Sequence, residues 1–196
     1  MTTIAIVTGS IRNGRQSLNV ARWVESIARH RSDVTFEIVD IADFDLPVWD
    51  EGTPPAYGPS EQPQARAWTE KMASYDGYVF VVSEYNHSIT GALKNALDYL
   101  GTELHNKAAG FVSYGSAGGA RAVEHLRGIL SEMHVAHVRN SVLLSLFHDF
   151  ENFAEPKPTE PATAAVDPML DQLITWTRAM QAVRAGDFSE TEKTAA

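Results

Sequence analysis

The sequence contains no cysteine among its 196 residues. This absence excludes disulfide bonds, thiol nucleophiles, cysteine-ligated zinc sites and iron–sulfur clusters. The sequence also lacks any run approaching the ~20 apolar residues that a membrane span needs, and no basic, apolar leader precedes the first strand-like segment. We therefore expect a cytoplasmic protein without a membrane partner.

Several motifs of well-known enzyme classes are missing as well. There is no G-x-x-x-x-G-K-[ST] phosphate loop and no G-x-G-x-x-G dinucleotide fingerprint. Ser116 has a glycine two positions later, but the residue two positions before it is Tyr114 and not glycine. The sequence therefore lacks the G-x-S-x-G elbow of serine hydrolases at this serine. His134 and His137 stand near a strand start, where side chains three residues apart point to opposite faces. We expect no metal site.

The net charge is −9, and it is unevenly distributed. Acidity overall argues against nucleic acid as a partner. Residues 1–35, however, carry five arginines against Glu25 and Asp33, a local charge of +3, so the rest of the chain carries −12. A small anionic ligand bound near the N-terminus would suit this segment, and a solvated basic helix face would account for the charge equally well.

Apolar, branched runs alternate along the chain with segments of helical period. The predicted strands cover residues 3–8, 34–41, 78–82, 107–114 and 135–146, the last with an irregular middle at 139–141. The predicted helices cover residues 17–29, 61–73, 92–100, 120–133 and 167–184. Between them, the proline-rich segment 42–60 is predicted to be a long ordered loop, and 148–166 an extended surface loop.

Five β-α units in strict alternation predict an α/β fold with three layers, in which helices cover both faces of a doubly wound parallel sheet. Five strands favour the flavodoxin-like order 2-1-3-4-5 over a six-stranded dinucleotide fold. Strands one and three then flank the point where the order reverses, so the loops after them are expected to hold the ligand. We expect residues 1–185 to form this single domain and 186–196 to be a flexible tail.

The first candidate loop is residues 8–17, Thr-Gly-Ser-Ile-Arg-Asn-Gly-Arg-Gln-Ser, between the first strand and the first helix. A helix N-terminus presents free N–H groups and a positive dipole end to an anion. The loop adds neutral donors and two arginines, and no acid occurs before Glu25. A phosphate site is therefore predicted. A plain turn that Ser17 caps is the alternative.

The second loop, Ser83-Glu84-Tyr85-Asn86-His87-Ser88, follows the buried run 77–82. Tyrosine, asparagine and histidine side chains can supply a flat wall and hydrogen bonds for a planar ring. The third loop, residues 113–121, is Ser-Tyr-Gly-Ser-Ala-Gly-Gly-Ala-Arg. Its glycines permit close backbone approach to a ligand, although glycine before a helix also serves plain packing. Ser116 is expected to cap the helix that follows.

Taken together, the three loops resemble those of the NAD(P)H-dependent FMN reductases. The second loop and its helix are similar to the family's Pro-Glu-Tyr-Asn…Leu-Lys-Asn-Ala-(Ile/Leu)-Asp motif, with Ser83 in place of the usual proline. The first loop resembles the family's Gly-Ser-x-Arg phosphate loop, and the third its Ser-x-Gly-x-x-Gly-Gly loop. The resemblance covers most of residues 4–125.

This resemblance implies an enzyme with FMN as cofactor and NADPH or NADH as hydride donor. Hydride would pass to FMN, and electrons then to a small-molecule acceptor such as a flavin, quinone, azo dye, metal oxyanion or oxygen, with no catalytic side chain. A homodimer or homotetramer is also implied. The implied cofactor-binding residues are, for the phosphate, Ser10, Arg12, Arg15, Gln16 and Ser17, and for the flavin, Ser83, Glu84, Tyr85, Asn86, His87, Ser113, Tyr114, Gly115, Ser116, Gly118 and Gly119.

Two other classes of function stay open at this point. A one-electron carrier like flavodoxin would need no nicotinamide site, although flavodoxins usually lack a charge such as that of Arg12. A flavin-sensing module would bind FMN without turnover. Trp49, on the 42–60 loop, either covers a flavin of a neighbouring subunit or anchors the loop to its own core, and Trp23, Trp68 and Trp176 are expected to pack inside.

Overall fold

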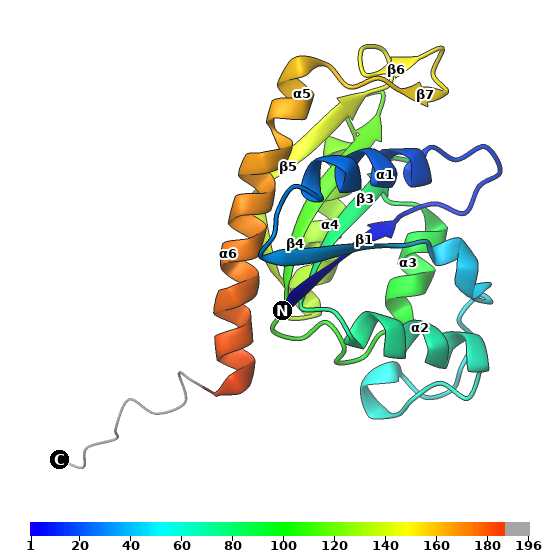
Figure 1. The fold of residues 1–196 in the computed structure, drawn as a ribbon. Helices are drawn as coiled ribbons and strands as arrows, with labels where there is room; N and C mark the ends of the chain where they lie inside the picture. Colours follow the sequence, from blue (N-terminus) through cyan, green and yellow to red (C-terminus); the bar gives the residue numbers. More distant parts are fainter. Residues whose placement is uncertain (187–196) are drawn as a thin grey trace.

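The computed structural model describes residues 1–186, and its centre is a five-stranded parallel sheet (Figure 1). The strand order is β2-β1-β3-β4-β5, so the predicted flavodoxin-like order is confirmed. The strands are β1 (Thr2–Thr8), β2 (Val34–Val39), β3 (Gly77–Ser83), β4 (Ala108–Gly115) and β5 (Ala136–Ser145). The predicted tail beyond Gly186 lies outside the described residues.

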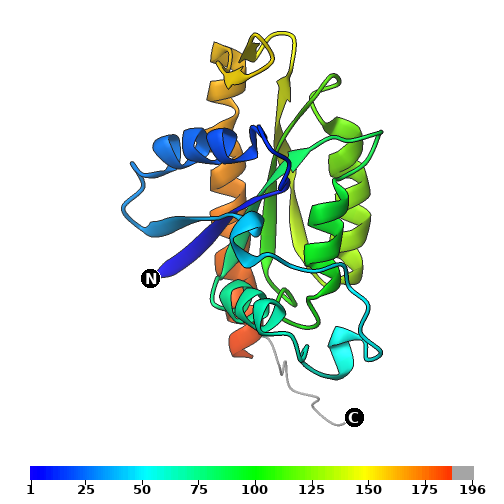
Figure 2. The same cartoon turned by 90° about the vertical axis from the view of Figure 1, so that its right-hand side faces the viewer.

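Helices cover both faces of the sheet, giving the predicted three layers (Figure 2). On one face lie α1 (Ser17–Ala28) and α6 (Val166–Ala185). On the other lie α2 (Pro63–Ala73), α3 (Gly91–Asp98) and α4 (Ala120–Glu132). Alternate strand residues serve the two layers, because side chains in a strand point to opposite faces. In β1, Ile4 and Ile6 pack toward α1 and α6, whereas Ala5 and Val7 pack toward the other three helices.

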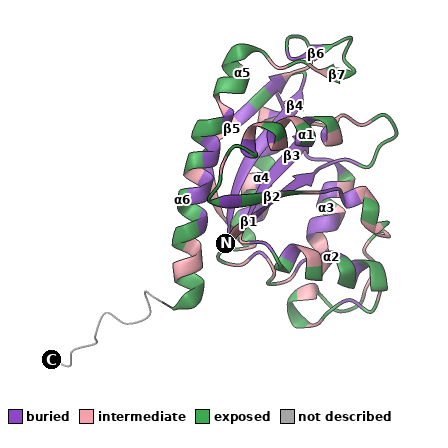
Figure 3. Ribbon diagram, viewed as in Figure 1, coloured by how far each residue is buried: buried purple, intermediate pink, exposed green. Residues whose placement is uncertain are grey.

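The central strands are buried from end to end (Figure 3). This explains why their sequences read as continuous apolar runs rather than as alternating ones. The irregular middle predicted for β5 is confirmed: the register between β4 and β5 shifts between Ala109 and Phe111. None of the helices in the described part of the chain is long and apolar enough to cross a bilayer.

The prediction of an extended loop at 148–166 is wrong. This segment forms the small hairpin of β6 (Phe150–Glu151) and β7 (Glu155–Pro156) and then the short helix α5 (Glu160–Ala164). The buried Asp149 carboxylate organises it by accepting hydrogen bonds from the Ser145 and Thr159 N–H groups, both at 2.8 Å. Phe150 is buried against the Tyr114 ring. The composition of the segment predicted a loop because Asp149 and Phe150 hold it in place as single residues, and single residues leave no periodic pattern in the sequence.

Segment 42–60 is ordered, as expected, and contains the 3-10 helices η1 (Ile41–Phe44) and η2 (Pro55–Tyr57). Trp49 is half-buried against the core of its own chain, which is the anchoring alternative. Trp68 is fully buried, as predicted, and Trp23 packs partly against the core. Trp176 is 46% exposed, so its predicted packing role is wrong, because its position on α6 faces away from the sheet.

Candidate functional site

The first loop leaves the carboxyl end of β1 and enters α1 without a capping side chain. Gln16 is the N-cap residue, and its backbone is already in the right-handed helical region. Ser17 therefore lies inside the helix, and the alternative in which Ser17 caps a plain turn is wrong. The Ser17 hydroxyl instead donates to the Ser10 carbonyl at 3.3 Å. No acidic residue lies in the first turn. The N–H groups at the start of α1 therefore face the loop without a side-chain acceptor, which is the local requirement for anion binding.

Arg15, predicted as a phosphate ligand, forms an ion pair with the nearly buried Asp40, with Nη2 and Oδ2 2.7 Å apart. Asp40 directly follows β2, and its other oxygen accepts hydrogen bonds from the Thr8 hydroxyl and the Ala42 N–H. Burial disfavours the charged carboxyl, but these bonds and the Arg15 charge outweigh it and lower the pKa of Asp40. Arg15 thus anchors the loop to the end of β2, and Arg12 carries the loop's other positive charge.

Tyr85 joins the first loop to the second. Its hydroxyl lies 3.1 Å from the Ser10 Oγ and accepts a hydrogen bond from the Arg12 Nε at 3.0 Å. These contacts span more than 70 residues of sequence, and they form because β1 and β3 are neighbours in the sheet. Three predicted site residues are therefore brought together at the point where the strand order reverses.

The second loop turns sharply at Asn86 and His87. Tyr85 and Ser88 exchange both backbone hydrogen bonds, at 2.9 and 3.1 Å. The φ angles of Asn86 and His87 are 49° and 75°, and positive φ at both central residues is the pattern of a type I′ turn. A histidine in this region is uncommon and costs conformational energy. The turn exposes both side chains at the rim of the site.

Glu84 and Arg121 form an ion pair that links the second loop to the start of α4. The Glu84 side chain is 4% exposed, and one of its oxygens has no hydrogen-bond partner within the described residues. Burial opposes ionisation of this carboxyl, but the hydrogen bond and charge of Arg121 prevail and hold its pKa below the ordinary value. Neither Arg121 nor Asp40 belongs to the predicted set.

The third loop packs against the second through its glycines. A Cβ on Gly119, whose φ is +76°, would lie 2.7 Å from the Ser113 Cβ and 2.8 Å from the Tyr114 N, so only glycine fits. Gly119 is also the N-cap residue of α4, so the expected cap by Ser116 is wrong. Ser116 is exposed. The Ser113 hydroxyl donates to the Gly118 carbonyl at 2.7 Å, and the Ser83 hydroxyl donates to the Tyr114 hydroxyl. These buried side chains therefore stabilise the second and third loops.

The three loops therefore meet at the carboxyl edge of the sheet, where open α/β sheets bind ligands. Residues 2–149 match the sequence profile of a family described as NADPH-dependent FMN reductase. The chain belongs to this family. The match runs from β1 to the beginning of the β6–β7 hairpin and includes all three loops, and the resemblance drawn from the motifs is confirmed.

Individual proteins are also similar to this chain in sequence. An NAD(P)H-dependent FMN reductase of a Nectria species is 41% identical over 128 residues, which cover 62% of this chain and 64% of that protein. A quinone reductase of Escherichia coli K12 is 36% identical over 135 residues, or 65% of this chain and 68% of that protein. The chain thus matches about two thirds of the length of these relatives.

Solved structures agree on the fold of this FMN reductase family member. The flavoenzyme FerB of Paracoccus denitrificans, an NAD(P)H:acceptor oxidoreductase, superposes with a TM-score of 0.69 at 17% identity. The superposition covers 89% of this chain and 98% of FerB. At this identity the likeness shows the fold alone.

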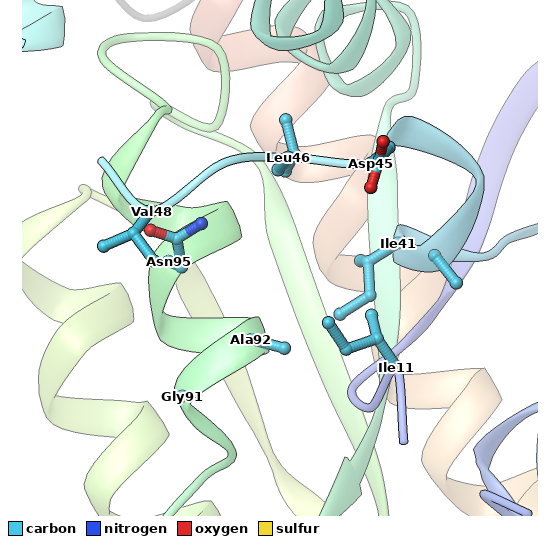
Figure 4. A pocket seen from close by; sticks show the side chains of 9 residues that line it. Ile11, Ile41, Asp45, Leu46, Val48, Gly91, Ala92 and Asn95 are labelled. Atoms are coloured by element: carbon cyan, nitrogen blue, oxygen red, sulfur yellow. The ribbon is translucent and has the colours of Figure 1, made fainter. Parts of the chain in front are cut away.

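A cleft of about 410 Å³ opens beside the first two loops (Figure 4). Ile11 of the first loop lines one side, and Gly91 and Ala92, at the start of α3, line another. The remaining lining residues come from α3 and from the segment after β2, namely Asn95, Ile41, Ala42, Asp45, Leu46 and Val48. Asn95 holds this segment in place, since its amide nitrogen donates to the Pro47 carbonyl at 2.7 Å and its oxygen accepts from the Trp49 N–H at 2.9 Å.

Proposed function

We propose that this chain is an FMN-dependent oxidoreductase that takes hydride from NADPH or NADH and reduces a small-molecule acceptor. The observation that carries the proposal is the junction of Ser10, Arg12 and Tyr85, which joins a phosphate-type loop to an aromatic loop. FMN carries both a phosphate and a planar ring, and such a junction suits a ligand of that kind. Membership of the FMN reductase family supports the same cofactor.

The donor set at the first loop fits a phosphate dianion. The uncapped N–H groups of α1, the Ser10 hydroxyl and the Arg12 guanidinium are all donors. Arg15 pairs with Asp40, so the charge of this carboxylate is already balanced. We infer that Ser10, Arg12 and the backbone of residues 16–18 hold the phosphate, and that Arg15 keeps the loop in place.

The flavin ring would lie between the second and third loops. Tyr85, Asn86 and His87 offer exposed side chains at its edge. Gly119 packs the third loop tightly against Ser113 and the Tyr114 backbone, which fixes the position of the backbone of residues 115–119. When bound, FMN supplies the hydride chemistry. The protein supplies position, a rigid backbone of N–H donors and, through Glu84 and Arg121, a charge-balanced support.

We further propose a homodimer or homotetramer in the cytoplasm, where NAD(P)H is available. Tyr57, which is 84% exposed on the segment after β2, adds apolar area for a subunit contact. The net charge of −9 supports a small-molecule substrate rather than nucleic acid. Size-exclusion chromatography with light scattering tests the assembly, and a monomer at micromolar concentration would contradict it.

An anaerobic flavin experiment tests the function. The purified protein is saturated with FMN, freed of excess and mixed with NADPH while the visible spectrum is recorded. Rapid bleaching of the bound flavin is the expected result. A protein that stays yellow would instead be an electron carrier or a flavin sensor. A colourless protein after desalting that also fails to turn over free FMN would contradict the proposal.

A further inference from the structure

We propose that His87 of the second loop and His125 of α4 together bind Zn²⁺. The proposed reaction does not require this ion, so the site goes beyond the proposed function. Two imidazoles are its protein ligands and water takes the other positions, because no group of three or more histidine, aspartate or glutamate side chains within residues 1–186 could hold a metal ion. Three observations support the site: the distance between the rings, the orientation of His125 and the strained backbone at His87.

The two imidazole rings lie close enough to share one ion. Their centroids are 6.2 Å apart, and their planes are inclined by 41°. With zinc–nitrogen bonds of about 2.0 Å, two imidazoles on one tetrahedral ion have ring centroids about 5 Å apart. Both residues are exposed, so rotation of the two side chains closes the remaining gap without displacing a packed neighbour. Histidine spacing in the sequence did not predict this pair, because the two rings come from different elements.

His125 is already oriented by a hydrogen bond at its other ring nitrogen. Its Nδ1 lies 2.9 Å from the Ser88 Oγ. Histidines that bind metals usually donate their second ring N–H to a protein group, which fixes the ring and leaves the first nitrogen for the ion. With the hydrogen on Nδ1, the His125 Nε2 carries a lone pair, and no atom of the described residues bonds to it. This nitrogen is therefore available to a cation.

The backbone at His87 is strained, and no packing within the chain offsets the strain. Its φ of 75° lies in the left-handed region, at a turn position where glycine is preferred. The side chain is exposed, and its ring contact is with His125. Strained residues concentrate at functional sites, because the surrounding structure holds them there for a purpose other than packing. A ligand between the two rings would supply that purpose.

The charges around the pair set its expected affinity. Two ion pairs involve residues of α4 beside His125, and each is balanced: Glu84 with Arg121, and Glu124 with Arg127. Arg12, on the first loop, has no carboxylate partner among the described residues, and its positive charge opposes a cation at the rim. Two neutral imidazoles without an anionic ligand make a weak site, so we expect a dissociation constant in the micromolar range.

A second histidine pair provides the matched control. The rings of His105 and His134 are stacked, with centroids 4.4 Å apart and planes inclined by 28°. The lone pair of a ring nitrogen lies in the plane of its ring, so the lone pairs of stacked rings run side by side and do not converge on one ion. Calorimetry measures Zn²⁺ binding to the full-length, metal-free wild type and to His87→Gln, His125→Gln and His105→Gln, in phosphate-free buffer.

We expect the wild type to bind one Zn²⁺ per chain. His87→Gln and His125→Gln should each weaken this binding at least about ten-fold, because each removes one of the two ligands, whereas His105→Gln should bind as the wild type does. Both substituted side chains are exposed, so neither variant is expected to unfold. Equal affinity in all four proteins would overturn the proposal, and so would a loss in His105→Gln alone.

The ion has a consequence for the proposed reaction, and this part rests on the proposed function. The flavin ring is proposed to lie between the second and third loops, and α4 directly follows the third, so an ion on His87 and His125 joins the segments on both sides of the ring. Saturating Zn²⁺ should therefore slow the bleaching of bound FMN by NADPH in the wild type, reversibly with EDTA, and leave the rate of His125→Gln unchanged.

The two measurements fail separately. If NADPH bleaches no flavin even without Zn²⁺, the proposed function is wrong, while the calorimetric titration still decides whether the histidine pair binds the ion. If Zn²⁺ slows the wild type and His125→Gln equally, the ion does not act through this pair, and the consequence for the reaction is refuted.

Discussion

Arg12→Ala should weaken the binding of FMN far more than it weakens the binding of riboflavin, which has the same ring without the phosphate. A charge-assisted hydrogen bond to a phosphate contributes about 2 kcal/mol at a partly exposed site, and its loss is about a 30-fold loss of affinity. The substitution also removes the 3.0 Å bond from the Arg12 Nε to the Tyr85 hydroxyl. That loss affects both ligands alike and is worth about 1 kcal/mol.

The ratio of the two affinities therefore isolates the phosphate contact. Titration of each flavin by fluorescence quenching, at low salt, gives both constants. Arg22→Ala is the matched control, because Arg22 lies exposed on α1 and its removal changes the net charge by the same amount. We expect the control to alter either affinity by less than about two-fold. Equal losses for FMN and riboflavin in Arg12→Ala would refute the assignment of the loop to the phosphate.

Three further predictions concern stability. Gly119→Ala should lower the free energy of unfolding by about 3 kcal/mol, because Gly119 has a positive φ and its Cβ would contact the Tyr114 backbone. Gly128→Ala, at an open position inside α4, should instead raise the melting temperature, and thermal melts of the two variants test both expectations. Arg15→Ala should cost about 2 kcal/mol in urea titrations at pH 7, because it leaves Asp40 charged and nearly buried. Despite burial, the ion pair lowers the pKa of Asp40, so this cost should fade as the pH falls below the ordinary value of 3.8, and an unchanged cost at pH 2.5 would contradict it. Burial lowers the pKa of Lys107 from 10.5 to about 8. Between these two pH values the Lys107 amine is therefore protonated in the unfolded chain and neutral in the folded chain. Stability should therefore rise with pH across that window by up to about 3 kcal/mol, and Lys107→Met should abolish this increment.

The sheet could be predicted because its information is local. The β1 and β3 segments are apolar runs that end in polar loops, and the number of strands favoured one order. The ligand loops then followed from that order, without any knowledge of contacts. The end of β2 was predicted two residues too late, since the strand ends at Val39 and not at residue 41. Asp40 ends it, because its carboxylate accepts from the Ala42 N–H and caps the 3-10 helix η1.

The support of the site could not be predicted, because it is made between distant residues. Asp40 meets Arg15 across 25 positions, and Glu84 meets Arg121 across 37. Each pair joins segments that are brought together only by the order of the strands in the sheet. A signal existed for Asp40, since it is a polar residue directly after a strand beside β1. The expected cap by Ser116 failed for a related reason: the backbone turns at Gly119, and a serine three residues earlier is left in solvent.

Asp40 connects the phosphate loop to the segment after β2 that lines the cleft. One of its oxygens binds Arg15 in the phosphate loop, and the other binds the N–H of Ala42, a residue of the cleft wall. The phosphate loop and this part of the cleft wall are thus both bonded to one carboxylate. A substitution at position 40 would therefore disturb the phosphate loop and the wall of the cleft at the same time.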